Sequence, residues 1–252
     1  MTGASDTSLR MLTFAPTIDS ETARLALRWY GVSFVEEDHL FGWVSLLTLR
    51  HGGYGVLPLV YDDRLSLNGS RRLIAHFDPL ARHARRLIPD DLATEADADW
   101  AAYNVALGHE VAVFAYFHLL AAPELMIPVF AEPVPPGEAR LTPKVYPALR
   151  WLFTTLLQLK PERAQVAATR IRDIFAATDR RLGNGRRFLQ GDRLTLGDVA
   201  FAGAAAPLLQ PPGFGARLPD IATMPVVLRE TVAELRRHAT ADYVDRVYGA
   251  MP

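Results

Sequence analysis

The sequence predicts an α/β domain followed by an all-helical domain. The hydrophobic pattern supports this division, because short apolar runs near the N-terminus give way after residue 78 to long stretches with helical spacing. A charged segment with prolines separates the two patterns, as expected of a linker. Of the 252 residues, 50% are hydrophobic, which is enough for two cores.

The first domain is expected over residues 10–78. Apolar runs predict strands at residues 11–14, 32–35, 56–61 and 64–67. Apolar residues with helical spacing predict a helix that Asp19 or Ser20 caps and that Gly31 ends. A second helix is expected to begin at Ser70, and the segment between residues 35 and 56 is expected to be irregular.

Residues 79–95 are expected to form the linker, and residues 96–252 the helical domain. Apolar residues recur three and four apart between Trp100 and Phe117. Pro161 is suited to the first turn of another helix, which Gly183 would end. Residues 226–237 predict a further helix, whereas the prolines of residues 128–147 predict a break in the helical series.

Charge and composition exclude several classes of function. The formal net charge is −1, so there is no basic field for nucleic acid or for an anionic membrane. The chain has no cysteine, which excludes disulfides, thiolate metal sites and a cysteine nucleophile, and we expect no metal centre. Residues 1–9 are short and polar, so we expect a disordered tail on a cytoplasmic protein.

The segment from Arg187 to Phe201 contains a signal for a helix start. Thr195 and Asp198 stand three apart, so each side chain can satisfy a backbone N–H of the other residue in a capping box. Leu194 and Val199 have the spacing of a hydrophobic staple. Taken alone, this pattern indicates only that a helix begins here.

The sequence before the capping box carries more information. The run Phe188-Leu-Gln-Gly-Asp192 resembles the folding box in the C-terminal helical domain of the glutathione transferase superfamily. The order of strands and helices over residues 10–78 resembles the thioredoxin-like domain of the same proteins. The resemblance covers nearly the whole chain after residue 9 and implies glutathione as co-substrate.

The resemblance implies a set of glutathione-binding residues. Leu57 and Pro58 match the residue and the cis proline that present backbone groups to the cysteinyl part of glutathione, although a proline at an ordinary edge strand would look the same. Gly69 and Ser70 match the pair that holds the γ-glutamyl end. Ser70 agrees with that pattern, whereas Gly69 replaces an acidic or amide residue.

Two further positions bear on the match. Val56 stands where the superfamily often has a lysine for the glycyl carboxylate, and Arg50 or His51 could compensate. Phe14 has no hydroxyl and the chain has no cysteine, so the group that activates the thiol is expected to be another hydroxyl. One alignment with the superfamily gives Thr17 and another gives Ser20, and either could instead be a loop or capping residue.

The resemblance implies an enzyme that activates the glutathione thiol for attack on a small apolar electrophile, as in detoxification. Alternatives are a glutathione-dependent isomerase or ether-cleaving enzyme, and a non-enzymatic protein of the same fold that binds a ligand or a partner. A homodimer is also implied. Aromatic residues could line the electrophile pocket, although those with helical spacing could equally be core. They are Trp43, Tyr54, Trp100, Tyr103, Phe114 and Phe117.

Overall fold

The structure is a computed structural model that describes residues 8–183 and 185–252. Residues 1–7 of the expected tail lie outside the described residues, and the first strand begins at Leu9. Within the described part, no helix is long and apolar enough to cross a membrane.

The strands form one mixed sheet in the order β2-β1-β3-β4. The strands are β1 (Leu9–Thr13), β2 (Phe34–Asp38), β3 (Leu59–Tyr61) and β4 (Ser66–Asn68). The pairing of β1 with β2 is parallel, whereas β1 with β3 and β3 with β4 are antiparallel. A parallel pair needs a crossover connection, and the helix after β1 supplies it.

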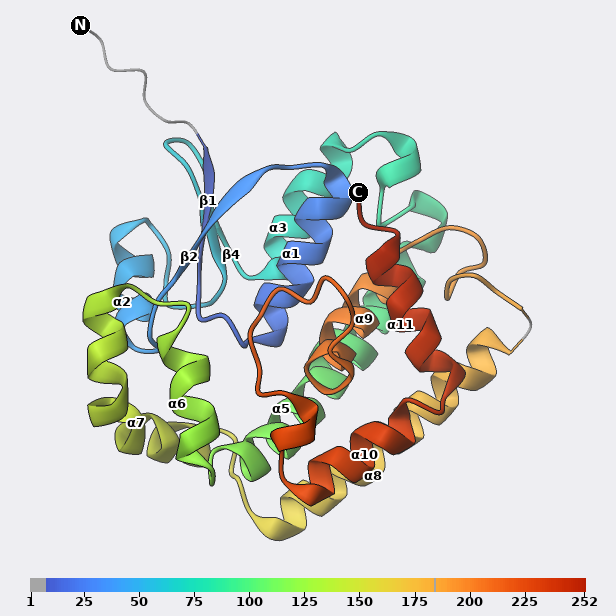
Figure 1. Cartoon of the computed structure of the whole chain (residues 1–252). Coiled ribbons are helices and arrows are strands. Elements are labelled where there is room, and N and C mark those ends of the chain that lie inside the picture. The colour runs from blue at the N-terminus through green and yellow to red at the C-terminus, as the bar shows by residue number, and fades with distance from the viewer. Residues whose placement is uncertain (1–7, 184) are drawn as a thin grey trace, which may run out of the picture.

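Helices cover both faces of this sheet. Figure 1 shows α1 (Ile18–Tyr30) and α3 (Ser70–Phe77) on one side and α2 (Trp43–Arg50) on the other. The segment that holds α2 was expected to be irregular, and that expectation was wrong. Only Val44 and Thr48 of α2 are buried, so the apolar residues of this helix do not follow the period of a buried face.

The first helix ends as predicted but begins earlier. Its cap is Thr17, whose hydroxyl accepts from the backbone N–H of Ser20, so neither Asp19 nor Ser20 is the capping residue. Gly31 ends the helix with a φ of 72°, a conformation that favours glycine. Thr17 therefore lies at the point where the chain enters α1.

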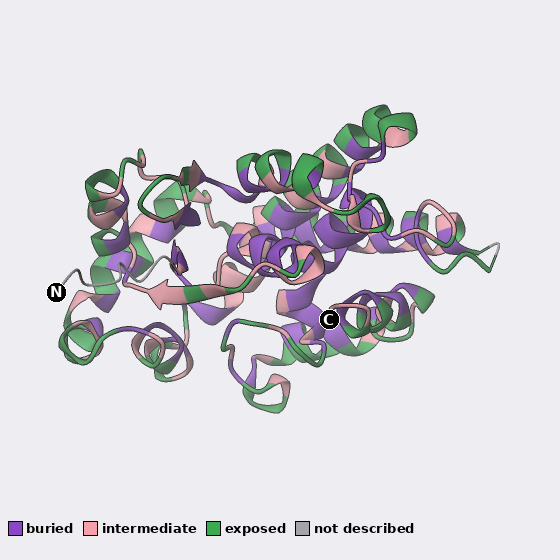
Figure 2. Ribbon diagram, turned by 90° about the horizontal axis from the view of Figure 1, so that it is seen from above, coloured by how far each residue is buried: buried purple, intermediate pink, exposed green. Residues whose placement is uncertain are grey.

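The rest of the chain is helical. The helices are α4 (Ala93–Trp100), α5 (Gly108–Leu119), α6 (Pro123–Ala131), α7 (Pro136–Leu156), α8 (Pro161–Leu182), α9 (Leu196–Leu209), α10 (Val226–Leu235) and α11 (Ala239–Gly249). A π-helical segment, Ala101–Leu107, joins α4 to α5. Figure 2 shows the buried residues gathered in the middle of the molecule, and nearly all of α9 is buried. The predicted fold class, an α/β domain of thioredoxin-like order with a helical domain, is confirmed, whereas the exact domain boundaries stay a prediction.

The predicted break at residues 128–147 is present but shorter than expected, because only residues 132–135 lie outside the helices. Pro128 lies inside α6, and Pro143 and Pro147 lie inside α7. Each interior proline removes one helical hydrogen bond at a cost of about 3 kcal/mol. The buried face of α7, which includes Tyr146 and Phe153, makes the tertiary contacts that offset this cost.

The predicted capping box is present at the start of α9. The Asp198 carboxylate accepts from the backbone N–H of Thr195 at 2.7 Å. It also accepts from the backbone N–H of Leu189 at 2.8 Å and from the Tyr243 hydroxyl at 2.7 Å. Burial nevertheless raises the pKa of this carboxyl, against the hydrogen bonds that lower it. Asp198 therefore joins the folding-box loop, α9 and α11.

Asp198→Ala should lower the free energy of unfolding by about 3–5 kcal/mol, because it leaves buried donors of Leu189, Thr195 and Tyr243 without a partner. Chemical denaturation measures the loss. Asp192→Ala is the matched control, since Asp192 is exposed in the same segment and should change stability by less than about 0.5 kcal/mol. Equal stability of the two variants would contradict this role of Asp198.

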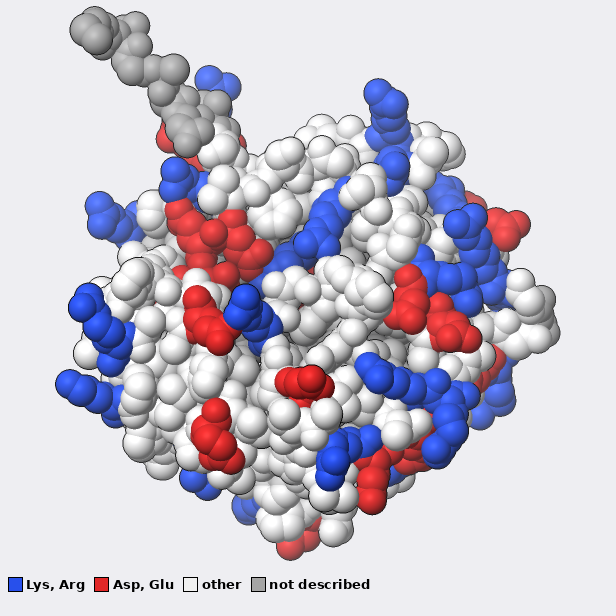
Figure 3. Space-filling model, viewed as in Figure 1, with Lys and Arg blue, Asp and Glu red and all other residues white. Residues whose placement is uncertain are grey.

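A second buried carboxyl lies at the end of β2. Asp38 has one carboxyl oxygen that is buried without a hydrogen-bond partner. Burial raises the pKa of Asp38 to about 7, and the charge of Glu36 adds to the rise while Arg24 opposes it. Figure 3 shows acidic side chains gathered on the face over the sheet, and Glu36, Glu37 and Asp38 line one groove.

Asp38→Asn should stabilise the protein, and by more at pH 8 than at pH 5. The folded state binds more protons than the unfolded state between the unfolded pKa of 3.8 and the folded pKa of about 7, so stability falls as the pH rises through this window. The gain at pH 8 should be about 1 kcal/mol or more. Thermal unfolding of Asp38→Asn and of exposed Asp63→Asn at both pH values tests this, and a gain that is the same at both would contradict it.

Candidate active site

The loop between β1 and α1 is held in place by an aromatic cluster. Phe14 is buried, and its ring centroid lies 5.7 Å from that of Phe41, 5.1 Å from that of Phe130 and 5.8 Å from that of Phe153. These rings come from both the sheet region and α6 and α7. The position of Thr17, three residues after Phe14, is therefore fixed from both parts of the molecule.

Three hydroxyls form a chain at this loop. The Ser20 hydroxyl lies between those of Thr13 and Thr17, with 2.5 Å between the Ser20 and Thr17 oxygens. Thr13 and Ser20 are fully buried, whereas Thr17 is partly exposed and lines a cavity. Of the two predicted hydroxyls, only Thr17 therefore reaches the cavity, and Ser20 lies behind it.

The peptide bond between Leu57 and Pro58 is cis, as the sequence predicted. The Pro58 carbonyl accepts from the N–H of Gly69 at 2.8 Å, and the Val56 carbonyl accepts from the Asn68 amide at 2.9 Å. No hydrogen bond from another described residue reaches the backbone N–H or C=O of Leu57. These two groups can therefore pair with the backbone of an extended ligand.

The N-terminus of α3 already holds a carboxylate. One Asp19 oxygen accepts from the backbone N–H of Ser70 at 2.9 Å, and the other accepts from the Ser70 hydroxyl. Gly69, which caps α3, has a φ of 77°, a conformation that favours glycine. Asp19 thus occupies the donors that the resemblance assigned to the γ-glutamyl end of glutathione.

Asn104 of the π-helical segment holds Asp19 from the other side. Its amide nitrogen donates to Asp19 at 3.1 Å, and its amide oxygen accepts from the Thr22 hydroxyl at 2.7 Å. Thr22 in turn lies against Gly203 of α9, where an added Cβ would come within 2.6 Å of the Thr22 hydroxyl. The orientation of Asp19 therefore depends on how closely α1 packs on α9.

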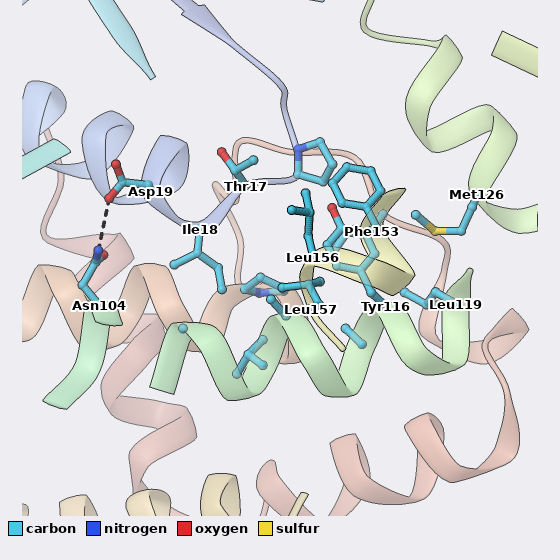
Figure 4. Close-up of a pocket in the computed structure, with 17 residues that line it drawn as sticks. Thr17, Ile18, Asp19, Asn104, Tyr116, Leu119, Met126, Phe153, Leu156 and Leu157 are labelled. Atoms are coloured by element: carbon cyan, nitrogen blue, oxygen red, sulfur yellow. Dashed lines mark hydrogen bonds between the residues drawn. The ribbon is translucent and has the colours of Figure 1, made fainter. Parts of the chain in front are cut away.

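A cavity of about 320 Å³ opens beside the first turn of α1. Figure 4 shows Thr17, Ile18 and Asp19 along one side of it, with Tyr116 of α5 and Phe153 of α7 opposite. Most of its lining side chains are apolar, among them Met126. Such a cavity suits a small apolar molecule. The polar side chains of its lining are Thr17 and Asp19 beside the loop, Asn104 on the π-helical segment and Tyr116 on α5.

Tyr116 is a polar lining residue that the sequence did not single out. Its ring stacks on that of Phe153 with a centroid separation of 5.1 Å and an interplanar angle of 6°. Burial raises the pKa of the Tyr116 phenol, so the hydroxyl keeps its proton at neutral pH. Helical spacing could have drawn attention to it, because Tyr116 lies four residues from Ala112, which also lines the cavity.

The aromatic residues named from the sequence do not line this cavity. Tyr103 and Phe114 are buried in the core, which agrees with the interpretation of the stripe as core. Trp43 and Tyr54 are 58% and 53% exposed. Trp43 lines a separate groove between α2 and α7.

Neither Arg50 nor His51, the two residues that could compensate for a missing lysine near Val56, lines the cavity. The ring centroid of His51 lies 4.2 Å from that of Tyr61. His51 lines the groove that also contains Glu36 and Glu37, which is acidic and separate from the cavity. Among the described residues, no group of three or more histidines and acids could hold a metal ion.

No family model and no curated protein matches the sequence. Similar solved structures do exist. A glutathione S-transferase of Methylobacterium radiotolerans, solved with glutathione sulfonate, is 18% identical over 98% of this chain and 92% of its own, with a TM-score of 0.58. One from Xanthobacter autotrophicus is 18% identical over 97% and 94%, also with a TM-score of 0.58.

A third structure, a glutathione S-transferase of Ceriporiopsis subvermispora in complex with glutathione, is 13% identical. It covers 97% of this chain and 99% of its own, with a TM-score of 0.55. Identities of this size establish the fold, while the reaction is set by the residues of the site. The resemblance that the sequence indicated is thus confirmed in three dimensions, and the chain has the fold of these glutathione S-transferases.

Proposed function

We propose that this protein is a glutathione transferase-like enzyme that holds a small thiol at Thr17 and presents it to an apolar electrophile in the cavity. The observation that carries the proposal is the position of the Thr17 hydroxyl at the N-terminus of α1 and at the edge of an apolar cavity. The unpaired backbone N–H and C=O of Leu57 support it, because they suit an extended peptide that contains a cysteine.

The hydroxyl chain leaves one proton for the ligand. Thr13, Ser20 and Thr17 carry three hydroxyl protons and share two contacts. Thr13 is fully buried, so a proton left without an acceptor there would be costly. The favoured direction runs from Thr13 to Ser20 to Thr17, and the Thr17 proton is then directed to the cavity.

A hydrogen bond from Thr17 is strong enough to matter for a thiol. Charge-assisted hydrogen bonds contribute about 1.5–3 kcal/mol, which lowers the pKa of a thiol by about one to two units from about 8.5. The N-terminus of α1 adds to this effect, whereas the negative charge of Asp19 in the same turn opposes it. The balance gives a substantial thiolate fraction at neutral pH.

Glutathione, the co-substrate that the fold implies, fits this site only in part. Thr17 and Leu57 can serve its cysteinyl portion. The donors of Ser70 are already taken by Asp19, and no lysine stands near Val56 for the glycyl carboxylate. These contacts support the binding of a thiol, but they do not identify that thiol as glutathione.

The second candidate is a protein that binds an apolar ligand without catalysis. The contact between Asp19 and Ser70 favours it, because this contact fills a place where the superfamily binds its co-substrate. The choice between transfer, isomerisation and ether cleavage depends on the electrophile. The homodimer, the cytoplasmic location and the role in detoxification stay predictions.

Thr17→Val should raise the pKa of the bound thiol by about one to two units and lower kcat at neutral pH about tenfold or more. Binding of the thiol should change by less than about threefold, since the hydrogen bond acts mainly on the thiolate. The thiolate absorbance of the bound thiol, titrated against pH, measures the pKa directly. Turnover with an aryl halide, using glutathione and cysteinylglycine in turn, measures kcat.

Thr169→Val is the matched control, because Thr169 is exposed on α8 and its hydroxyl bonds only within that helix. Thr17→Val should also lose about 1 kcal/mol of stability as a helix cap, so the assay must be run well below its melting temperature. An unchanged thiol pKa in Thr17→Val would exclude the thiolate role and favour the ligand-binding alternative.

A further inference from the structure

We propose that the segment between α9 and α10, residues 211–219, is a gate over the cavity and that the ion pair between Arg217 and Glu132 is its latch. The inference goes beyond the proposed function, because it concerns how any apolar ligand enters and leaves the cavity. Figure 1 shows this segment running in front of the start of α1 before it turns to α10.

The gate forms part of the cavity wall. Leu218 lines the cavity together with Thr17 and Ile18 at the start of α1, and Met126 of α6 belongs to the same lining. Leu218 is partly buried and packs against the hydrophobic core. Outward movement of Leu218 would therefore widen the path between solvent and the cavity.

One part of the gate is anchored in the core. The backbone N–H of Gly215 donates to both carboxylate oxygens of Glu21, at 3.2 Å each. Glu21 is buried and also holds the Arg24 guanidinium and the Tyr248 hydroxyl. A Cβ added to Gly215 would come within 2.4 Å of the Arg24 Cδ, so this close approach requires glycine. Breaking such a buried contact is costly, so we expect Gly215 to stay in place when the rest of the gate moves.

The latch lies at the surface. Arg217 pairs with Glu132, the residue that ends α6, and their side chains are 73% and 47% exposed. Because Leu218 follows Arg217 and Met126 lies on α6, the ion pair joins two walls of the cavity. An exposed ion pair shifts an equilibrium by up to about fivefold, and salt weakens it. The latch can therefore open while the anchor at Gly215 holds.

A latch of this kind has a specific kinetic signature. A ligand passes only while the gate is open, so loss of the latch raises the open population and with it both the association and the dissociation rate. The gate closes over the free and the occupied cavity alike, so the dissociation constant stays nearly the same. General damage to the cavity would change the dissociation constant instead.

Stopped-flow fluorescence with N-phenyl-1-naphthylamine, an uncharged apolar probe, measures both rate constants. Arg217→Ala and Glu132→Ala should each raise both rate constants about three- to fivefold at low salt, with the dissociation constant within about twofold of wild type. Salt at about 1 M should raise the wild-type rates to those of the variants and leave the variants nearly unchanged. Glu132→Arg combined with Arg217→Glu should restore slow exchange at low salt.

Glu234→Ala is the matched control, because it breaks a partly exposed ion pair with Arg172 that joins α8 to α10 and does not line the cavity. Ala112→Leu narrows the cavity and should weaken probe binding at least about fivefold, which assigns the signal to the cavity. Wild-type rates in Arg217→Ala and Glu132→Ala, fast exchange in the reversed pair, or probe binding that Ala112→Leu leaves unchanged would each overturn the proposal. The probe carries no thiol, so the result is independent of the test of the thiolate function.

Discussion

The close packing of α1 on α9 is the constraint on which the site depends. Gly203 of α9 has no side chain, so Thr22 of α1 can lie directly against it. Thr22 then orients Asn104, and Asn104 holds Asp19 on the N-terminus of α3. Asp198 secures the start of α9 through the capping box and its contact with α11. Through these contacts, the packing of α9 holds the Asp19 carboxylate at the N-terminus of α3.

The local features of this protein could be read from its sequence because they depend on short spacings. The capping box at Thr195 and Asp198 and the helix start at Ser70 follow from neighbouring residues, and both are present. The cis bond before Pro58 was implied by the family resemblance, and it is also present. The prolines of α7 misled because tertiary packing outweighs a local preference. The helix α2 was missed because its apolar residues are largely exposed.

The site could be predicted only in part, because its decisive contacts join distant residues. Asp19 lies 51 positions from Ser70 and 85 from Asn104, and no spacing rule links such residues. The sequence did mark Gly69 as a departure from the superfamily pattern. In the structure, the Asp19 carboxylate of α1 lies at the N-terminus of α3, so a ligand there would meet a negative charge.

A crystal structure of the protein with cysteinylglycine tests the central claim, that Thr17 holds the thiol at the edge of the apolar cavity. We expect the sulfur within hydrogen-bond distance of the Thr17 hydroxyl, the peptide backbone paired with Leu57, and Asp19 still bonded to Ser70. A structure in which the sulfur lies away from Thr17, or in which the ligand carboxylate has displaced Asp19 from Ser70, would contradict it.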